Sequence, residues 1–266
     1  MLLLNVTFMG RQASLIALRR RLEALESLSL TPRLKGEARA GAALPFGVPA
    51  IDGALPGGGL ALGALHEVAG SGGDEEDGAM AAAFVAGILA RLLPPQPVLW
   101  CLAVDDLYGP GLAASGLAPE RLILVRGGSN QDVLWAMEEG LRSKALAAVV
   151  GEVATLSLSA SRRLQLAAEA SSTTALALRR WRNADLARRQ RLSPNAAVTR
   201  WRVTALPGET RGEPGVGTSR WQVALWRCRS GVPAEWIVEA CDATGHVALA
   251  AELADRPARR RQAANG

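Results

Sequence analysis

Cysteine and histidine are scarce in this sequence, and their scarcity excludes two classes of site. The three cysteines, Cys101, Cys228 and Cys241, form no C-x-x-C pair, and His66 and His246 lie far apart in the chain. A disulfide framework needs more cysteines at this length, and a structural zinc site needs closely spaced pairs of ligands. We therefore expect three free thiols and no metal site.

Lysine is almost absent as well. Lys35 and Lys144 are the only two among 30 basic residues, so the other 28 are arginines. The formal net charge is +5, which permits an anionic partner without requiring one. With so strong an arginine bias, a cluster of arginines is not by itself a sign of function.

Long apolar runs are also missing. The sequence holds no stretch of about 18 uncharged apolar residues, the length that a spanning helix needs. The short apolar run after Met1 has no basic residue before it, unlike a signal peptide. We expect a cytoplasmic protein with no membrane partner. The start of translation stays open between Met1 and Met9.

Leucines at helical spacing predict an amphipathic helix over residues 11–30. Leu15, Leu18, Leu22 and Leu25 recur at steps of three and four residues. The polar segment that follows is typical of a linker. The helix has two ways to bury its leucine stripe, on its own domain or on a partner chain.

Strand and helix patterns alternate from residue 45 to about residue 180. The strand candidates there are nearly continuous apolar runs, typical of parallel strands covered by helices on both faces. Later strands follow one another through tight turns, as in antiparallel hairpins. The sequence therefore predicts an α/β fold with a mostly parallel central sheet flanked by helices and antiparallel hairpins at the C-terminal end. It predicts three regions: an N-terminal helix and linker (1–43), a main domain (44–250) and a basic disordered tail (251–266).

A phosphate-binding loop is expected after the first core strand, but its signature is degenerate. Gly73 and Gly78 keep the glycine spacing of G-x-x-x-x-G-K-[ST], while Ala79 and Met80 replace the lysine and the hydroxyl residue. Four acidic residues, 74–77, stand between the glycines. Like charges about 4 Å apart repel by roughly 4 kcal/mol at an effective dielectric near 20. We expect no nucleotide cofactor, no catalytic residues and no enzymatic activity.

The segment before that loop resembles a known superfamily. Residues 44–70, LPFGVPAIDGALPGGGLALGALHEVAG, are similar to the segment that leads into the phosphate loop of RecA-like ATPase cores, G-x-x-x-L-D-x-x-L-G-G-G-L-x-x-G-x-l-x-E-i-x-G. Within that superfamily, His66-Glu67, the degenerate loop and the end of the chain rich in tryptophan and arginine resemble the ImuA family, which overlaps the SulA-like superfamily. The resemblance covers about residues 44–250 and implies a RecA-like core.

The resemblance also shows where this chain departs from RecA proteins. Gly151-Glu152 follows the strand at which RecA proteins place the aspartate of the second nucleotide motif. Asp105 and Asp106 lie near the place of the catalytic glutamate without matching it, and their expected roles are turn formation and helix capping. Only residues 152–158 stand where RecA proteins insert their first DNA-binding loop.

Positive charge is concentrated after the strand predicted at 174–178. The six arginines and one aspartate of residues 179–191 sum to +5, the net charge of the whole chain. Three interpretations stay open: a DNA contact, a contact with an acidic protein, and a solvated connector. Among the five tryptophans of the C-terminal third we expect most in the core and one or two exposed. The candidate contact residues are Arg179, Arg180, Trp181, Arg182, Arg188, Arg189 and Arg191.

By resemblance, the chain is a non-catalytic accessory protein of error-prone translesion synthesis in the SOS response to DNA damage. The implied partners are an ImuB-like inactive Y-family polymerase homologue and an accessory DNA polymerase III alpha-type subunit. DNA is a further candidate partner, and the N-terminal helix is a candidate surface for self-association or for RecA. Two alternatives remain: a SulA-like inhibitor of cell division, and a RecA-like DNA-binding ATPase.

Overall fold

The computed structural model describes residues 6–7, 11–28, 42–92, 96–209 and 217–250. The basic tail and most of the linker predicted from the sequence lie outside these residues. The helices are α1 (Arg11–Leu28), α2 (Pro49–Asp52), α3 (Asp74–Ala90), α4 (Gly109–Ala114), the 3-10 helix η1 (Pro119–Arg121), α5 (Asn130–Arg142), α6 (Leu158–Ser171) and α7 (Ala184–Arg191).

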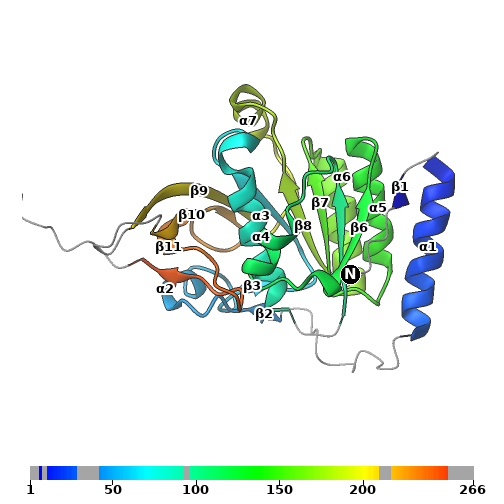
Figure 1. The fold of residues 1–266 in the computed structure, drawn as a ribbon, viewed down its shortest axis with the longest axis horizontal. Coiled ribbons are helices and arrows are strands. Elements are labelled where there is room, and N and C mark those ends of the chain that lie inside the picture. Colours follow the sequence, from blue (N-terminus) through cyan, green and yellow to red (C-terminus); the bar gives the residue numbers. More distant parts are fainter. Residues whose placement is uncertain (1–5, 8–10, 29–41, 93–95, 210–216, 251–266) are drawn as a thin grey trace, which may run out of the picture.

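A ten-stranded sheet forms the centre of the molecule, in the order β1-β6-β5-β7-β8-β4-β9-β10-β11-β12 (Figure 1). Strands from β1 to β9 in this order run parallel, and the last three join as antiparallel neighbours. The predicted α/β fold, with its mostly parallel sheet and antiparallel C-terminal strands, is confirmed. The strands are β1 (Val6–Thr7), β4 (Leu65–Gly70), β5 (Val98–Leu102), β6 (Leu122–Arg126), β7 (Ala148–Val153), β8 (Thr174–Arg179), β9 (Thr199–Glu209), β10 (Thr218–Cys228), β11 (Ala234–Glu239) and β12 (Ala248–Leu249); β2 (Ala43–Leu44) pairs with β3 (Leu60–Ala61) apart from them.

Helices cover both faces of the parallel part of the sheet, because its strands carry apolar side chains on both sides. On one face of the sheet, a buried core packs α2 and α3 against β5, β9 and β10. On the opposite face, a second core packs α1, α5 and α6 against the sheet. β3 and β4 are separate strands, with Gly63 in the left-handed region between them. No described helix is both long and apolar enough to span a bilayer.

The N-terminal helix α1 packs on its own domain. Leu18 and Leu22 are buried in the core that α5 and α6 share. Arg19 pairs with Glu139 of α5 at 2.8 Å, and a Glu26 carboxylate oxygen accepts hydrogen bonds from the Ser143 hydroxyl and the Lys144 amide. Of the two options that the sequence left open, the structure shows packing on the same chain.

The largest aromatic contact lies between α3 and the antiparallel strands. The indole of Trp201 on β9 is fully buried, with its ring centroid 5.4 Å from that of Phe46 and 5.8 Å from that of Phe84. Its Nε1 donates to the Thr199 hydroxyl at 2.7 Å. The expectation for the tryptophans is confirmed: Trp201 and two others are buried, while Trp226 is 45% exposed.

Replacing Trp201 by alanine should strongly destabilise the fold. We expect the free energy of unfolding to fall by about 3–5 kcal/mol, since the change removes buried apolar surface and leaves a cavity. Trp226→Ala on the neighbouring strand β10 is the control, with an expected loss below about 1.5 kcal/mol because that side chain is half exposed. Urea denaturation measures both, and equal losses would contradict this description of the core.

Candidate functional site

The segment at which a phosphate loop was expected is a short connection into a helix. β4 ends at Gly70, and α3 begins at Asp74 with Gly73 as its N-cap. Three residues therefore separate strand and helix. Gly78 lies inside the helix instead of in a loop. The four acidic residues form the first turn of the helix, where they interact favourably with the helix dipole.

The side chain of Asp77 turns back from this first turn and binds backbone N–H groups. Its carboxylate accepts from the amide of Gly72 at 2.8 Å and from the amide of Ala205 on β9 at 3.0 Å. The side chain is buried and lies so close to Gly70 that a β-carbon there would be 2.5 Å from its own. A carboxylate of the protein thus takes up the amide of Gly72, one of the N–H groups that a bound anion would use at such a connection.

Arg180, the first residue after β8, joins three carboxylates at the carboxyl edge of the sheet. Its Nε donates to Asp74 at 2.6 Å, its Nη2 to Asp106 at 2.7 Å and its Nη1 to Glu152 at 3.2 Å. These acids come from α3, from the segment after β5, and from β7. Burial alone would lower the pKa of the Arg180 guanidinium. The hydrogen bonds to Asp74 and Asp106 outweigh this effect, so the pKa lies above its usual value. We call this group of four side chains the Arg180 network.

Glu152 is the buried member of the Arg180 network. Besides Arg180, it accepts from the indole of Trp100 at 3.0 Å. Burial raises the pKa of Glu152, and the charge of Arg180 opposes this only in part. The resemblance puts the aspartate of the second nucleotide motif of RecA proteins near this position. Here the carboxylate of Glu152 pairs with the guanidinium of Arg180. Among the described residues, no cluster of His, Cys, Asp or Glu side chains has the arrangement of a metal site.

Two of the four acids at the start of α3 have partners within the protein. Asp74 pairs with Arg180, and Asp77 accepts two backbone hydrogen bonds, while Glu75 is exposed. Asp106 pairs with Arg180 and Asp105 with Arg126, where the sequence suggested only turn formation and capping. The carboxyl edge is occupied by the protein's own paired charges, so a nucleotide there would have to break them.

A second charged cluster lies on the opposite face of the sheet. The carboxylate of Glu67 on β4 accepts from Asn195 at 2.6 Å and from Arg200 at 3.0 Å. It also meets Arg202 at 3.2 Å and Arg179 at 3.5 Å. Burial alone would raise the pKa of Glu67, but the three guanidiniums lower it below its usual value. We call these five side chains the Glu67 cluster.

Of the Glu67 cluster, only Arg179 was among the site residues predicted from the sequence. A signal was present, since the alternation Arg200-Trp201-Arg202 puts two arginines on one face of β9. Nothing in the sequence alone pairs that face with Glu67, because the register of β4 and β9 comes from the folded sheet, with Glu67 opposite Arg200.

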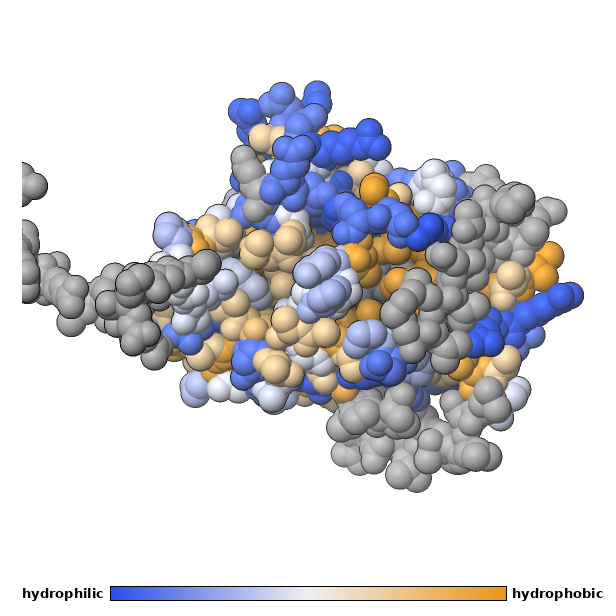
Figure 2. Space-filling view, viewed as in Figure 1, coloured by the Kyte–Doolittle hydropathy of each residue, from blue (hydrophilic) through white to orange (hydrophobic). Residues whose placement is uncertain are grey.

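The basic segment divides into an internal and an external part. Arg179 and Trp181 are buried, and Arg191 donates to the carbonyl of Ser71. Arg182 and, on α7, Arg188 and Arg189 are exposed, and Arg188 pairs with Asp185. α7 projects from one end of the molecule (Figure 1), and Figure 2 shows hydrophilic side chains gathered over it. The three exposed arginines are thus the part of the predicted contact set that faces solvent.

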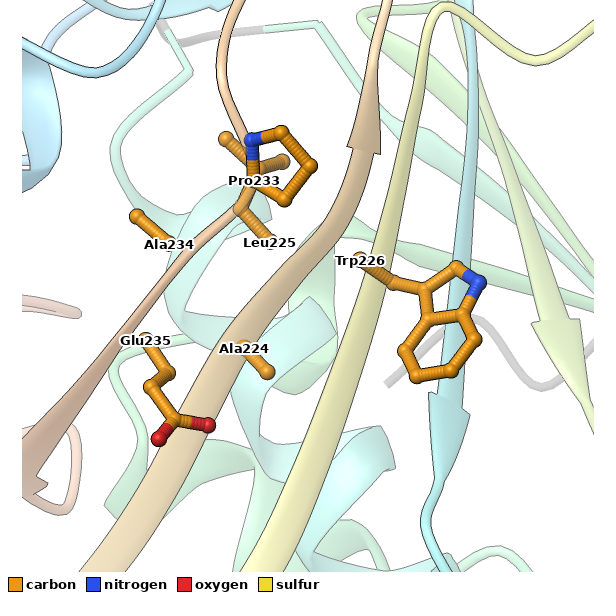
Figure 3. A pocket seen from close by; sticks show the side chains of 6 residues that line it. All are labelled: Ala224, Leu225, Trp226, Pro233, Ala234 and Glu235. Carbon is orange, nitrogen blue, oxygen red and sulfur yellow. The ribbon is translucent and has the colours of Figure 1, made fainter.

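The described surface also holds an open pocket on the antiparallel strands. It is lined by Ala224, Leu225 and Trp226 of β10 and by Pro233, Ala234 and Glu235 at β11 (Figure 3). None of its residues belongs to the Arg180 network. The pocket carries one carboxylate and no nucleophilic side chain, so we interpret it as a contact surface and not as a catalytic site.

Arg180 and Arg182 form a matched pair for testing the Arg180 network. Arg180→Met should lower the free energy of unfolding by about 2–4 kcal/mol, because it leaves the buried Glu152 without its positive partner. Arg182→Met, two residues away and exposed, should change it by less than about 0.5 kcal/mol. Chemical denaturation of both variants measures the difference, and similar losses would show that Arg180 is not an internal group.

His66 on β4 provides a pH-dependent test of the fold around Glu67. Its Nδ1 lies 2.7 Å from the Thr199 hydroxyl and its Nε2 2.7 Å from the carbonyl of Ala61, and burial lowers its pKa to about 4. As the pH falls, His66 is therefore protonated at a higher pH in the unfolded chain than in the folded protein. The stabilisation is complete above pH 6.5 and is lost toward pH 4, a change of up to about 3 kcal/mol.

Urea denaturation between pH 4 and pH 7 measures this dependence. The slope should be shallower in His66→Gln than in the unmodified protein. His246→Gln, which changes the other histidine at an exposed position, should keep the full slope. A slope that His66→Gln leaves intact would contradict the buried neutral histidine.

No protein-family model matches the chain. Two curated proteins, both called Protein ImuA and both from strains of Caulobacter vibrioides, are 43% identical to it over 125 residues. The match covers 46% of this chain and 51% of each relative, so the chain spans about half the length of the curated relatives it matches. This identity agrees with the resemblance found in the sequence and supports the assignment of the chain to the ImuA family.

Proposed function

We propose that this protein is a non-catalytic accessory protein of damage-induced mutagenesis. The observation that carries the proposal is the Arg180 network, which fills the carboxyl edge of the sheet with paired charges. The similarity to Protein ImuA over 125 residues supports the family context. On this proposal, the protein acts by binding other macromolecules.

The surface most suited to a partner is the basic end of α7. Arg182, Arg188 and Arg189 are exposed there, and Leu192, just beyond the helix, has 75% of its surface exposed. Arginines beside an exposed apolar side chain are typical of protein interfaces, where they pair with carboxylates. We propose that this surface docks an acidic region of the ImuB-like polymerase homologue, with the accessory DNA polymerase III alpha-type subunit joining the same assembly.

Charge reversal tests the docking surface. In Arg182→Glu/Arg188→Glu/Arg189→Glu we expect the capture of the purified ImuB-like homologue to weaken by about tenfold or more, because each contact becomes repulsive. The matched control, Arg20→Glu/Arg142→Glu/Arg162→Glu, changes the same number of exposed arginines on α1, α5 and α6 and should bind as the unmodified protein does.

The two triple variants also test the function in cells. The α7 variant should lower damage-induced mutation frequency, and the control should not. Unchanged capture by the α7 variant would remove this surface from the proposal, and equal weakening in both variants would show a general effect of charge. An unaltered mutation frequency in cells that lack the protein would contradict the accessory function itself.

A further inference from the structure

The Glu67 cluster holds more positive charge than it neutralises. Three buried guanidiniums, those of Arg179, Arg200 and Arg202, share the single carboxylate of Glu67, which leaves an excess of two positive charges. Unpaired buried charge is costly, and proteins usually compensate it with a counter-charge or a bound ion. Burial lowers the pKa of Arg179 to about 10 and also lowers that of Arg202, consistent with this excess.

One edge of the Arg202 guanidinium is unused. Its Nη1 donates to Glu67 and to the carbonyl of Trp201. Among the residues that the structure describes, none accepts a hydrogen bond from its Nε or Nη2, and the residue is only 3% exposed. Nε and Nη2 carry parallel N–H groups on the same side of the guanidinium, the fork that binds two oxygens of an oxyanion at once.

Two indoles hold Arg202 in place without satisfying this edge. The guanidinium carbon lies 5.4 Å from the ring centroid of Trp181 and 5.9 Å from that of Trp226. A cation–π contact acts through the face of the guanidinium and offers no acceptor in its plane. Trp226 is half exposed and lines the pocket in Figure 3 together with Glu235, so one of the two rings against Arg202 is open to solvent.

We propose that the Nε/Nη2 edge of Arg202 binds a phosphate group. A free dianionic phosphate matches the excess of two positive charges, whereas a phosphodiester or a carboxylate would halve it. Nε of Arg179 and Nε of Arg191 likewise find no acceptor among the described residues. The phosphate is either free or part of a single-stranded nucleic acid, whose bases would stack on the exposed Trp226. This site is independent of the proposed accessory function.

Thermal unfolding in sodium phosphate and in sodium chloride, at equal ionic strength and pH, tests the site. We expect phosphate to raise the Tm with the logarithm of its concentration above the Kd, by about 5 °C at roughly 100 times the Kd. General salt stabilisation does not depend on Arg202 and should remain in a variant that has lost the site. Arg202→Lys keeps the charge and removes the fork, so it should weaken binding by about tenfold or more. Arg162→Lys, at an exposed position on α6, is the matched control and should leave the shift unchanged.

Two probes then distinguish the sources of the phosphate. A short fluorescent oligothymidylate that binds the protein, and that inorganic phosphate displaces, would indicate a nucleic acid phosphodiester; saturable phosphate binding without oligonucleotide binding would indicate the free ion. A glutamate-rich peptide that binds through Arg202 while phosphate does not would overturn the assignment. If Arg202→Lys does not fold, the unmodified protein still decides, since equal Tm values in phosphate and chloride would also overturn it.

Discussion

The arrangement at the carboxyl edge of the sheet depends on the guanidinium of Arg180. Arg180 follows β8 directly, and it binds Asp74 at the start of α3, Asp106 after β5 and Glu152 on β7. These elements converge where parallel α/β sheets ordinarily bind their ligands, at the carboxyl ends of the strands. Because Glu152 is buried and Arg180 largely so, separating them would leave a charge in a low-dielectric environment. We therefore infer that this edge is a stable part of the fold and does not serve as a phosphate site.

Charge is unevenly distributed between the two faces of the sheet. In the Arg180 network one guanidinium meets three carboxylates, whereas the Glu67 cluster has three guanidiniums for one carboxylate. The exposed arginines at α7 form a third feature, separate from both. The arginines of these groups thus occur in three settings: an ion-pair network within the fold, a candidate anion site and a candidate docking surface.

The layout of the sheet could be predicted from the sequence because apolar runs and alternation are local signals. The burial of Trp201 and the exposure of Trp226 also agree with the expectation for the tryptophans. The helix α7 was missed since only Ala187 of its eight residues is buried, although the N-cap Asn183 and the basic last turn were visible. The partners of the arginines could not be predicted. Whether an arginine meets solvent, as Arg182 does, or three carboxylates, as Arg180 does, depends on elements that the fold brings together from 28 to 106 residues apart.

Isothermal titration calorimetry with magnesium and ATP tests the central claim most directly. With the Arg180 network intact, the account predicts no saturable heat at micromolar nucleotide for the full chain, since binding would have to break the ion pairs of Arg180 and displace the Asp77 carboxylate. A micromolar Kd, together with a structure in which the triphosphate lies over residues 71–74 and Arg180 has left Asp74, would contradict it.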